Sequence, residues 1–197
     1  MDFVLASGSA SRRRILTEAG ITFAAVLADI DEETLKGRYQ REGTAASQIA
    51  GRLAEAKALA VSAARSGALV LGADQTLLFE GAVVSKCSDL AAARLLLRRL
   101  RGHEHLLVGG YVLAHGGEVV WRHRETAHLV MRNFSDAFLD GYLAAEGQGV
   151  LSAVGCYKLE GRGMQLFEKV EGDYFSILGL ALQPLLAELR AQGVLQS

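Results

Sequence analysis

The order of apolar and polar positions predicts strands that alternate with helices. Short apolar runs bounded by Gly, Ser or acidic residues are typical of buried strands, and apolar side chains three or four positions apart predict helices. Residues 44–66 show one apolar stripe that stops at Gly67, and residues 106–113 and 118–130 predict a hairpin around Gly116-Gly117. In the first half of the chain, we expect a strand at 3–6, a helix capped by Ser11 and closed by Gly20, an extended stretch at 21–30, a polar loop at 34–43, a helix at 44–66 and a strand at 68–79 that is interrupted at 73–76. The second half is expected to contain a helix from Ser88 or Asp89 to 101–102, the hairpin, a helix at 135–145, a strand at 164–170 and a helix at 178–193.

This alternation, with one hairpin inserted, predicts an α/β fold around a mixed sheet. A length of 197 residues suits one domain, or two small lobes that share a core. The sequence contains no repeat and no linker-like tract. We therefore expect a single domain over residues 1–197.

The charge balance limits the partners that the protein can have. Lys and Arg number 21 against 22 Asp and Glu, which gives a formal net charge of −1. A chain without a basic excess cannot displace the counterions of duplex DNA over a wide surface, so we expect no DNA binding. A local basic cluster can still bind a small polyanion. Because half of the residues are apolar, a disordered chain is also excluded.

The cysteine count and the N-terminal pattern indicate the compartment. Cys87 and Cys156 are too few for a disulfide framework, and their spacing is not that of a zinc site. No apolar run approaches the ~20 residues that cross a bilayer. The first apolar patch precedes the arginines, whereas a signal peptide has its basic residues first. We therefore expect a cytoplasmic protein with reduced thiols and no membrane association.

A Ser- and Gly-containing loop between the first strand and the first helix is a candidate anion site. It runs from Ser7 to Ser11 and leads into Arg12, Arg13 and Arg14. Loop amides, a helix N-terminus and guanidinium groups would all attract one phosphate. A solvated basic turn is the alternative. The loop is not a Walker A motif, because the Gly-Lys-Ser/Thr ending is absent.

Asp74 is a candidate catalytic or metal-binding carboxylate, because it interrupts a strongly apolar strand. Burying a carboxylate is costly without a metal, a proton or a partner. A strand-end Asp that caps a loop is the alternative. The acidic group at residues 29–33, which includes Glu32, follows the second extended stretch. One of its carboxylates, together with Asp74, could hold Mg²⁺ or Mn²⁺, which prefer oxygen ligands.

Three further charged residues have competing interpretations. Lys57 stands among alanines on the long helix, where a solvent-reaching surface lysine is the ordinary case. Lys86 follows the turn after the Asp74 strand. Glu160 lies in a Gly-rich loop and could accept hydrogen bonds from a nucleobase edge, or simply be solvated.

Taken together and in this order, the motifs resemble those of the Maf family of nucleoside triphosphate pyrophosphatases, once described as septum-formation inhibitors. The resemblance spans essentially the whole chain. The matching segments are Leu5-Ala6-Ser7-Gly8-Ser9-Ala10-Ser11-Arg12-Arg13, Arg52-Leu53-Ala54-Glu55-Ala56-Lys57-Ala58, Gly72-Ala73-Asp74-Gln75-Thr76, Ser85-Lys86-Cys87, Glu160-Gly161-Arg162-Gly163 through Phe167-Glu168, Glu171-Gly172-Asp173-Tyr174 and Leu178-Gly179-Leu180.

The resemblance implies a hydrolase that acts on acid anhydrides and converts a nucleoside triphosphate to the monophosphate and pyrophosphate in a house-cleaning role. It implies an elongated, two-lobed Maf/ITPase-like fold around a highly curved mixed sheet with flanking helices, a cleft between the lobes, a divalent metal and a homodimer. Asp74 would accept the proton of water or bind the metal, and Glu32 would bind the metal. The positions that match triphosphate-contacting residues are Ser9, Arg12, Arg13, Lys57 and Lys86.

Features near the expected base site resemble one branch of the family. Gln75, Lys158 and Glu160 resemble the branch that acts on 7-methyl-GTP, and a carboxylate suits the positive charge of a methylated guanine. Ser11, also a candidate substrate-binding residue, stands where that branch has Trp. Ala10, Cys87 and Ala181 replace family prolines, and Gly109-Gly110 replaces a Thr-Gly pair. These departures support the alternative of a nucleotide-binding regulator of cell division or septum formation with little turnover.

Overall fold

The computed structural model describes residues 1–196, and the chain forms two compact units. Unit 1 contains Met1–Gln75, Gly109–Glu125 and the segment from Asp173 onward. Unit 2 contains Thr76–Val108 and Thr126–Gly172. Three long strands contribute residues to both units.

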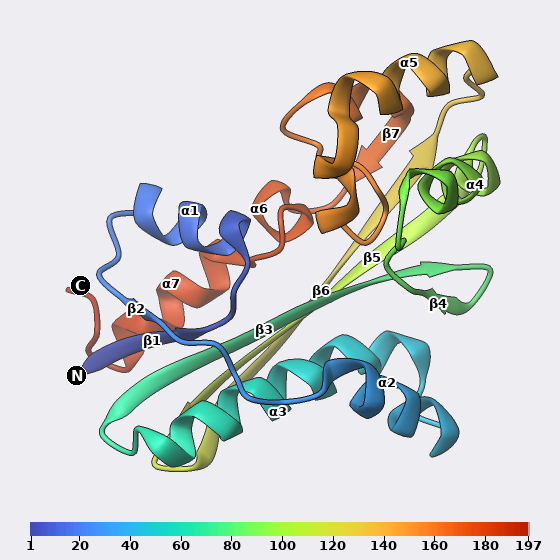
Figure 1. The fold of residues 1–197 in the computed structure, drawn as a ribbon. Helices are drawn as coiled ribbons and strands as arrows, with labels where there is room; N and C mark the ends of the chain where they lie inside the picture. The colour runs from blue at the N-terminus through green and yellow to red at the C-terminus, as the bar shows by residue number, and fades with distance from the viewer. Residues whose placement is uncertain (197) are drawn as a thin grey trace. The chain divides into compact units, whose positions relative to one another are not determined.

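Strands and helices alternate along the chain, as the sequence pattern predicts (Figure 1). The strands are β1 (Asp2–Ala6), β2 (Ala24–Ala25), β3 (Ala68–Phe79), β4 (Ala82–Val84), β5 (Glu104–His115), β6 (Glu118–Met131) and β7 (Phe167–Glu171). The α-helices are α1 (Ala10–Glu18), α2 (Glu32–Arg41), α3 (Ile49–Ala64), α4 (Leu90–Leu100), α5 (Asp136–Glu146), α6 (Tyr174–Ile177) and α7 (Leu182–Ala191), and the 3₁₀ turns are η1 (Ala46–Gln48), η2 (Gly147–Ser152) and η3 (Arg162–Leu166).

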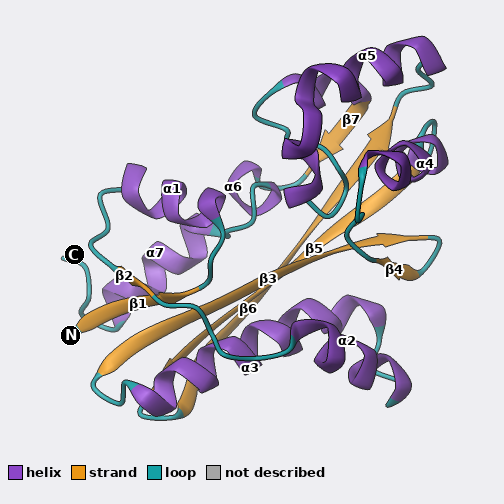
Figure 2. Ribbon diagram, in the orientation of Figure 1, coloured by secondary structure: helices purple, strands orange, loops and turns teal. Residues whose placement is uncertain are grey.

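The strands form one mixed sheet in the order β2-β1-β3-β5-β6-β7, with β4 paired to β3. Strand β1 runs parallel to both β2 and β3, whereas β4 and β7 are antiparallel to their neighbours. Helices flank this sheet (Figure 2). The predicted α/β class with a mixed sheet is therefore confirmed.

In unit 1, helices cover both faces of the strands. Apolar residues of α1 and α7, such as Leu16 and Leu185, pack with Leu5 and Leu71 on one face. On the other face, α3 packs through Ala54, Ala58 and Val61 against apolar residues of β1, β3 and β5, and α2 lies against α3. The two-sided cover explains why β3 is a nearly continuous apolar run.

Two glycines let α3 approach the sheet closely. A Cβ on Gly72 would collide with the Ala54 carbonyl oxygen and would lie 2.7 Å from the Ala58 nitrogen. A Cβ on Gly110 of β5 would lie 2.5 Å from the Gly51 Cα. Helix and strands therefore meet backbone to backbone at both points.

Several sequence-based expectations for individual elements are wrong. Residues 34–43 were expected to be a loop, but most of them form α2, which buries no residue and so shows no apolar stripe. Its N-cap is Asp31, whose side chain accepts from the Thr34 backbone N–H at 3.0 Å. The cap of α1 is Ser9 instead of Ser11. Within 21–30, only Ala24–Ala25 is a strand, and it pairs with Val4 and Leu5 of β1.

Three further boundaries differ. Strand β3 is continuous through 73–76, since Asp74 has a cationic partner. Strand β7 begins at Phe167, because residues 162–166 form a 3₁₀ turn. The helix expected at 178–193 begins only at Leu182, after Gly179, whose φ is +108°, and the short α6 before it was not predicted. Pro184 is the third residue of α7, where a missing N–H costs little.

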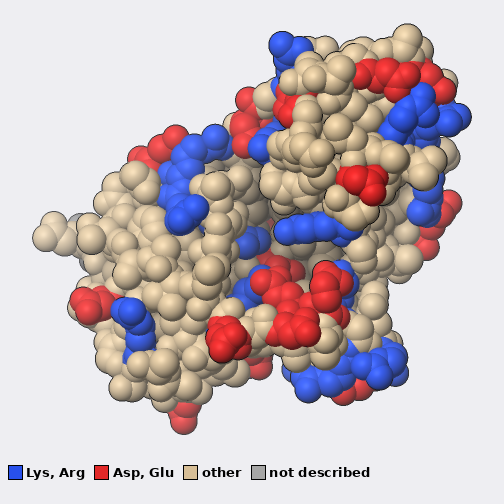
Figure 3. Space-filling model, viewed as in Figure 1, with Lys and Arg blue, Asp and Glu red and all other residues tan. Residues whose placement is uncertain are grey.

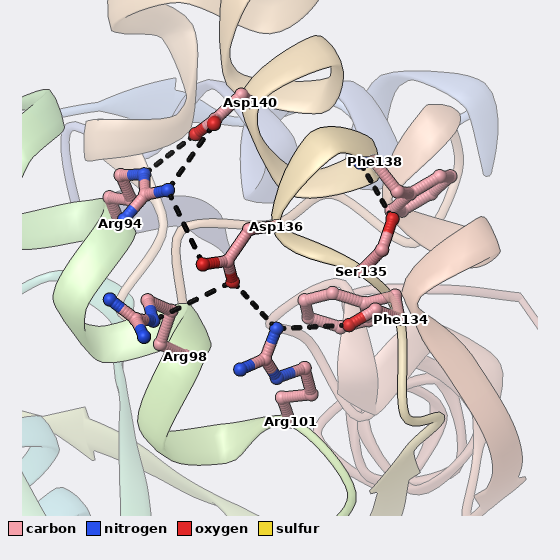
Figure 4. A network of polar contacts seen from close by, with 8 residues as sticks. All are labelled: Arg94, Arg98, Arg101, Phe134, Ser135, Asp136, Phe138 and Asp140. Atoms are coloured by element: carbon pink, nitrogen blue, oxygen red, sulfur yellow. Dashed lines mark hydrogen bonds and ion pairs between the residues drawn. The ribbon is translucent and has the colours of Figure 1, made fainter.

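Unit 2 contains α4, α5 and the short β4 and β7, and its helices carry good N-caps. Asp89 caps α4 and Ser135 caps α5, both as predicted. Arg94 and Arg98 on α4, and Arg101 directly after it, form ion pairs with the carboxylates of Asp136 and Asp140 on α5 (Figure 4). Both thiols, Cys87 and Cys156, are free, and burial raises the pKa of Cys156 to about 12, with the neighbouring Cys87 adding to this rise.

The surface agrees with a near-zero net charge. Basic and acidic side chains are interspersed over the face drawn in Figure 3. Among residues 1–196, the helices are all too short or too polar to cross a bilayer.

Candidate active site

Serine hydroxyls accept hydrogen bonds from the backbone of the loop between β1 and α1. Ser9 has an extended backbone and its side chain caps α1 by accepting from the Arg12 N–H at 3.4 Å. Ser7 is buried, and its Oγ accepts from the Ser9 N–H at 3.2 Å. The first turn of α1 contains no acidic residue, so its dipole is open to an anion. The hydroxyls of Ser7 and Ser9 thus fix the backbone of this loop.

Arg12 is buried and is held at both ends of its guanidinium group. Its Nε donates to the Gly179 carbonyl oxygen at 2.8 Å, and its Nη1 donates to Ser7 Oγ at 3.1 Å. In this structure, Arg12 therefore joins the loop to the segment between α6 and α7. Arg13 is exposed and extends from the same turn, so its guanidinium is accessible to a ligand.

The most unusual electrostatic feature of unit 1 is a buried ammonium between two carboxylates. Lys57 Nζ lies 2.7 Å from Asp74 Oδ1 and 2.8 Å from Glu32 Oε2. The exposed fraction of the side chain is 7% for Lys57, 14% for Asp74 and 52% for Glu32. The interpretation of Lys57 as a surface lysine is therefore wrong. The cost of burying Asp74 is offset by this ion pair.

The sheet register brings the loop and the carboxylate to one edge. Ala6, the last residue of β1, pairs with Gly72 of β3. The loop therefore begins level with the residue before Asp74. Because both strands run parallel, the hydroxyl loop and the ion pair lie at the carboxyl-terminal edge of β1, where α/β sheets bind ligands.

Consecutive residues of β3 serve opposite faces of the sheet. Asp74 points to Lys57 on α3, whereas the Gln75 amide donates to the carbonyl oxygens of Ser176 at 2.8 Å and Ile177 at 3.3 Å. As placed, Gln75 holds α6 against the strand. Asp173 caps this short helix by accepting from the Ser176 N–H at 2.7 Å.

The donors around Lys57 suit an oxygen-seeking metal. Among residues 1–196, no cluster of three or more His, Cys, Asp or Glu side chains forms a preformed metal site. Mg²⁺, however, is usually held by one or two carboxylates together with substrate phosphate and water. Asp74 and Glu32 both contact the Lys57 ammonium, which occupies the point between the two carboxylates in this structure.

The remaining predicted residues are distributed over both units. Ser11 is half-buried on α1. Lys86, Lys158 and Glu160 belong to unit 2, where Lys86 and Glu160 are exposed and Lys158 is half-buried. The backbone of Lys158 passes so close to Gly163 that a Cβ there would lie 2.5 Å from the Lys158 carbonyl oxygen. This loop is therefore tightly folded.

Residues 2–192 match a known family, which is described as Maf-like protein. The chain belongs to the Maf family. A nucleoside triphosphate pyrophosphatase of Granulibacter bethesdensis is 47% identical over 96% of this chain and 96% of its own. A second protein of the same name, from Caulobacter vibrioides, is 48% identical over 97% and 96% of the two chains. A 7-methyl-GTP pyrophosphatase of Mesorhizobium japonicum is 47% identical over 98% and 96%.

Maf membership confirms the predicted resemblance and accounts for the order of the motifs. The predicted homodimer and the cytoplasmic location stay predictions. Two residues that bind Arg12 beside the loop between β1 and α1 were not predicted individually. They are Ser7, whose Oγ accepts from the Arg12 guanidinium, and Gly179, whose carbonyl oxygen also accepts from it. The only signal for Gly179 was its place in the Leu178-Gly179-Leu180 motif.

Proposed function

We propose that this chain hydrolyses a nucleoside triphosphate to the monophosphate and pyrophosphate. The observation that carries the proposal is the Lys57 ammonium buried between Asp74 and Glu32, beside a serine- and arginine-containing loop. A buried charged group at the ligand-binding edge of an α/β sheet is expected at a functional site. The names of the relatives from Granulibacter and Mesorhizobium support the same reaction.

In this proposal, one water molecule is consumed and the anhydride bond between the α- and β-phosphates is broken. Asp74 accepts the proton of the attacking water, and pyrophosphate leaves with the electron pair of the bridging oxygen. The ammonium of Lys57 holds the Asp74 carboxylate in place through a 2.7 Å contact. The N-terminus of α1 and the exposed Arg13 stabilise charge on the phosphate oxygens.

We assign the divalent ion to Asp74 and Glu32. When bound, Mg²⁺ or Mn²⁺ would neutralise charge on the phosphate oxygens. Lys57 already brings the two carboxylates to one point, and it keeps their mutual repulsion small before any ion arrives. Exchange of Glu32 for Gln is expected to raise the metal concentration needed for half-maximal activity.

The test is pyrophosphate release over a panel of nucleoside triphosphates, with Mg²⁺ or Mn²⁺ and with EDTA as control. We expect metal-dependent release of one pyrophosphate for each monophosphate formed. Release of inorganic phosphate alone would contradict the proposed bond. Nucleotide binding without any release would instead support a regulator with little turnover.

Within this function, we assign base selection to the loop of Lys158 and Glu160. A carboxylate suits 7-methyl-GTP, because the methylated base is cationic and offers N–H donors. Glu160→Gln is expected to lower the ratio of kcat/KM for 7-methyl-GTP to that for UTP by about tenfold, the worth of one charge-assisted hydrogen bond. Glu168→Gln, a substitution at an exposed site on β7, is the matched control. An unchanged ratio in the Glu160 variant would refute this assignment.

A further inference from the structure

Unit 1 contains a hollow that none of the predicted site residues lines. It has a volume of about 530 Å³ and lies between the first half of α3 and strands β5 and β6. Arg52 and Glu55 line it from α3, and Arg122, His123 and Arg124 line it from β6. A volume of this size is in the range of small-molecule sites. We call this hollow the arginine groove.

The arginine groove is separate from the ion pair of Lys57. Arg52 and Lys57 are five residues apart on one helix, which turns their side chains about 140° away from each other. Lys57 is buried against β3, whereas Arg52 is exposed. The two basic residues of the Arg-Leu-Ala-x-x-Lys-Ala motif therefore serve different places, and the proposed hydrolysis uses only Lys57.

The groove carries an excess of positive charge. Its single carboxylate, Glu55, binds Arg122 with an Oε2 to Nε distance of 2.9 Å. Within residues 1–196, the guanidinium groups of Arg52 and Arg124 make no hydrogen bond and no ion pair. Two guanidinium groups without a protein partner in the described part of the chain therefore line one hollow.

The two arginines of β6 lie on an open part of the sheet edge. Arg122 and Arg124 lie on the same side of β6, about 7 Å apart along the strand. Strand β7 pairs with β6 only from His128 to Met131, so the stretch that carries these arginines has an open edge. One planar guanidinium group can donate two parallel N–H bonds to the oxygens of a phosphate, so it binds phosphate without a second donor.

We propose that the arginine groove binds the phosphate chain of a small polyphosphate anion, either pyrophosphate itself or the phosphate tail of a nucleotide. Arg52 and Arg124 provide the two free guanidinium groups. Arg122 is fixed by Glu55 and borders the site. The site is additional to the one where hydrolysis is proposed, and its existence does not depend on that reaction.

The chain carries its own probe for this site. Trp121 is the only tryptophan, and its ring stacks on His123 with a centroid distance of 5.6 Å and an interplanar angle of 7°. Because Trp121 directly precedes Arg122 on β6, an anion that orders this part of the strand is expected to change the Trp121 fluorescence. The titration uses pyrophosphate with EDTA present, so that metal-dependent binding elsewhere does not contribute.

We expect a saturable change in wild-type fluorescence and at least a tenfold rise in Kd for the Arg52→Ala/Arg124→Ala variant. The matched control is Arg65→Ala/Arg190→Ala, which removes the same charge from two exposed positions of unit 1. It should bind within twofold of wild type. Titration with ATP and with AMP separates the sources, because a nucleotide site favours ATP over pyrophosphate and a phosphate-chain site binds both but not AMP.

Three results would overturn the proposal. The first is no saturable signal at millimolar pyrophosphate. The second is an equal loss of binding in the control variant, which would indicate only general charge attraction. The third is a shift of the curve by Arg13→Ala but not by the groove variant, which would place the anion at the loop of α1. Pyrophosphate release by the groove variant tests the proposed hydrolysis separately, since we expect it to be retained.

Discussion

The ion pairs around Lys57 in unit 1 and around Asp136 in unit 2 use similar groups in opposite surroundings. Lys57 is almost completely buried and meets two carboxylates. The Asp136 side chain is 45% exposed and meets Arg94, Arg98 and Arg101 (Figure 4). The exposed network contains more contacts, yet water already solvates its members, so each contact adds little to stability. The buried network is costly to form, and it lies at the carboxyl-terminal edge of β1, beside the Ser7–Ser11 loop.

Asp74→Asn should give the largest effect. The amide keeps the shape of the side chain but cannot accept a proton from water, so we expect kcat to fall by ~100-fold or more. The measurement is pyrophosphate release at saturating nucleotide and metal. The circular dichroism spectrum should match that of the wild type. Turnover within threefold of wild type would remove Asp74 from its assigned role.

Lys57→Met tests the stability of the buried network. Removing the ammonium leaves a carboxylate that is 14% exposed without its partner, and we expect a loss of about 2 kcal/mol in urea unfolding. The double variant Lys57→Met/Asp74→Asn should regain part of that loss, since no charge is then left unpaired. Lys169→Met, which breaks an exposed pair with Glu171, is the control and should leave the unfolding midpoint unchanged.

Arg12→Lys should have a smaller effect on stability. A lysine has one nitrogen and cannot reach both the Gly179 carbonyl and Ser7 Oγ, so about 1 kcal/mol should be lost. Arg13→Lys, at the exposed neighbouring position, is the comparison and should unfold like the wild type. Equal midpoints for the two variants would show that the Arg12 contacts contribute nothing measurable.

Asp136→Asn/Asp140→Asn should have the smallest effect. Hydrogen bonds from Arg101 and Arg94 lower the pKa of Asp136 and Asp140 below the ordinary value of 3.8. Their contribution to stability is therefore present above pH 3.8 and is lost as the pH falls through the lower pKa of the folded state. Urea unfolding of the variant should differ slightly from wild type at neutral pH, and the two should converge in acid and in high salt. A difference that grows in acid would contradict this sign.

The sequence predicted elements whose signals are local. The caps Asp89 and Ser135 and the turn at Gly116-Gly117 were found because each signal lies within a few residues. Helix α2 was missed, since it depends on its Asp31 cap and on polar pairs such as Lys36–Glu33 instead of an apolar stripe. Its signal, an Asp followed by two Glu, was present but was interpreted as a metal-binding cluster.

The candidate site was predicted less completely than the fold, because its burial is a tertiary property. Residues alone favoured a surface position for Lys57, and only the packing of α3 on β3 buries it. The motif resemblance alone assigns Lys57 to the candidate site. Neither source predicted that Arg12 would bind a carbonyl oxygen 167 residues away, since long-range contacts to the backbone leave no side-chain signature.

Gly72 and Gly110 lie on neighbouring strands, and each meets a different turn of α3. Two separated points fix the direction of a rod as well as its distance from a surface, so α3 can neither tilt nor slide without a collision between backbones. The alignment of Lys57 with Asp74, two residues beyond Gly72, depends on these two close approaches. The position of this buried ion pair therefore depends on the absence of side chains at two strand positions that carry no chemistry of their own.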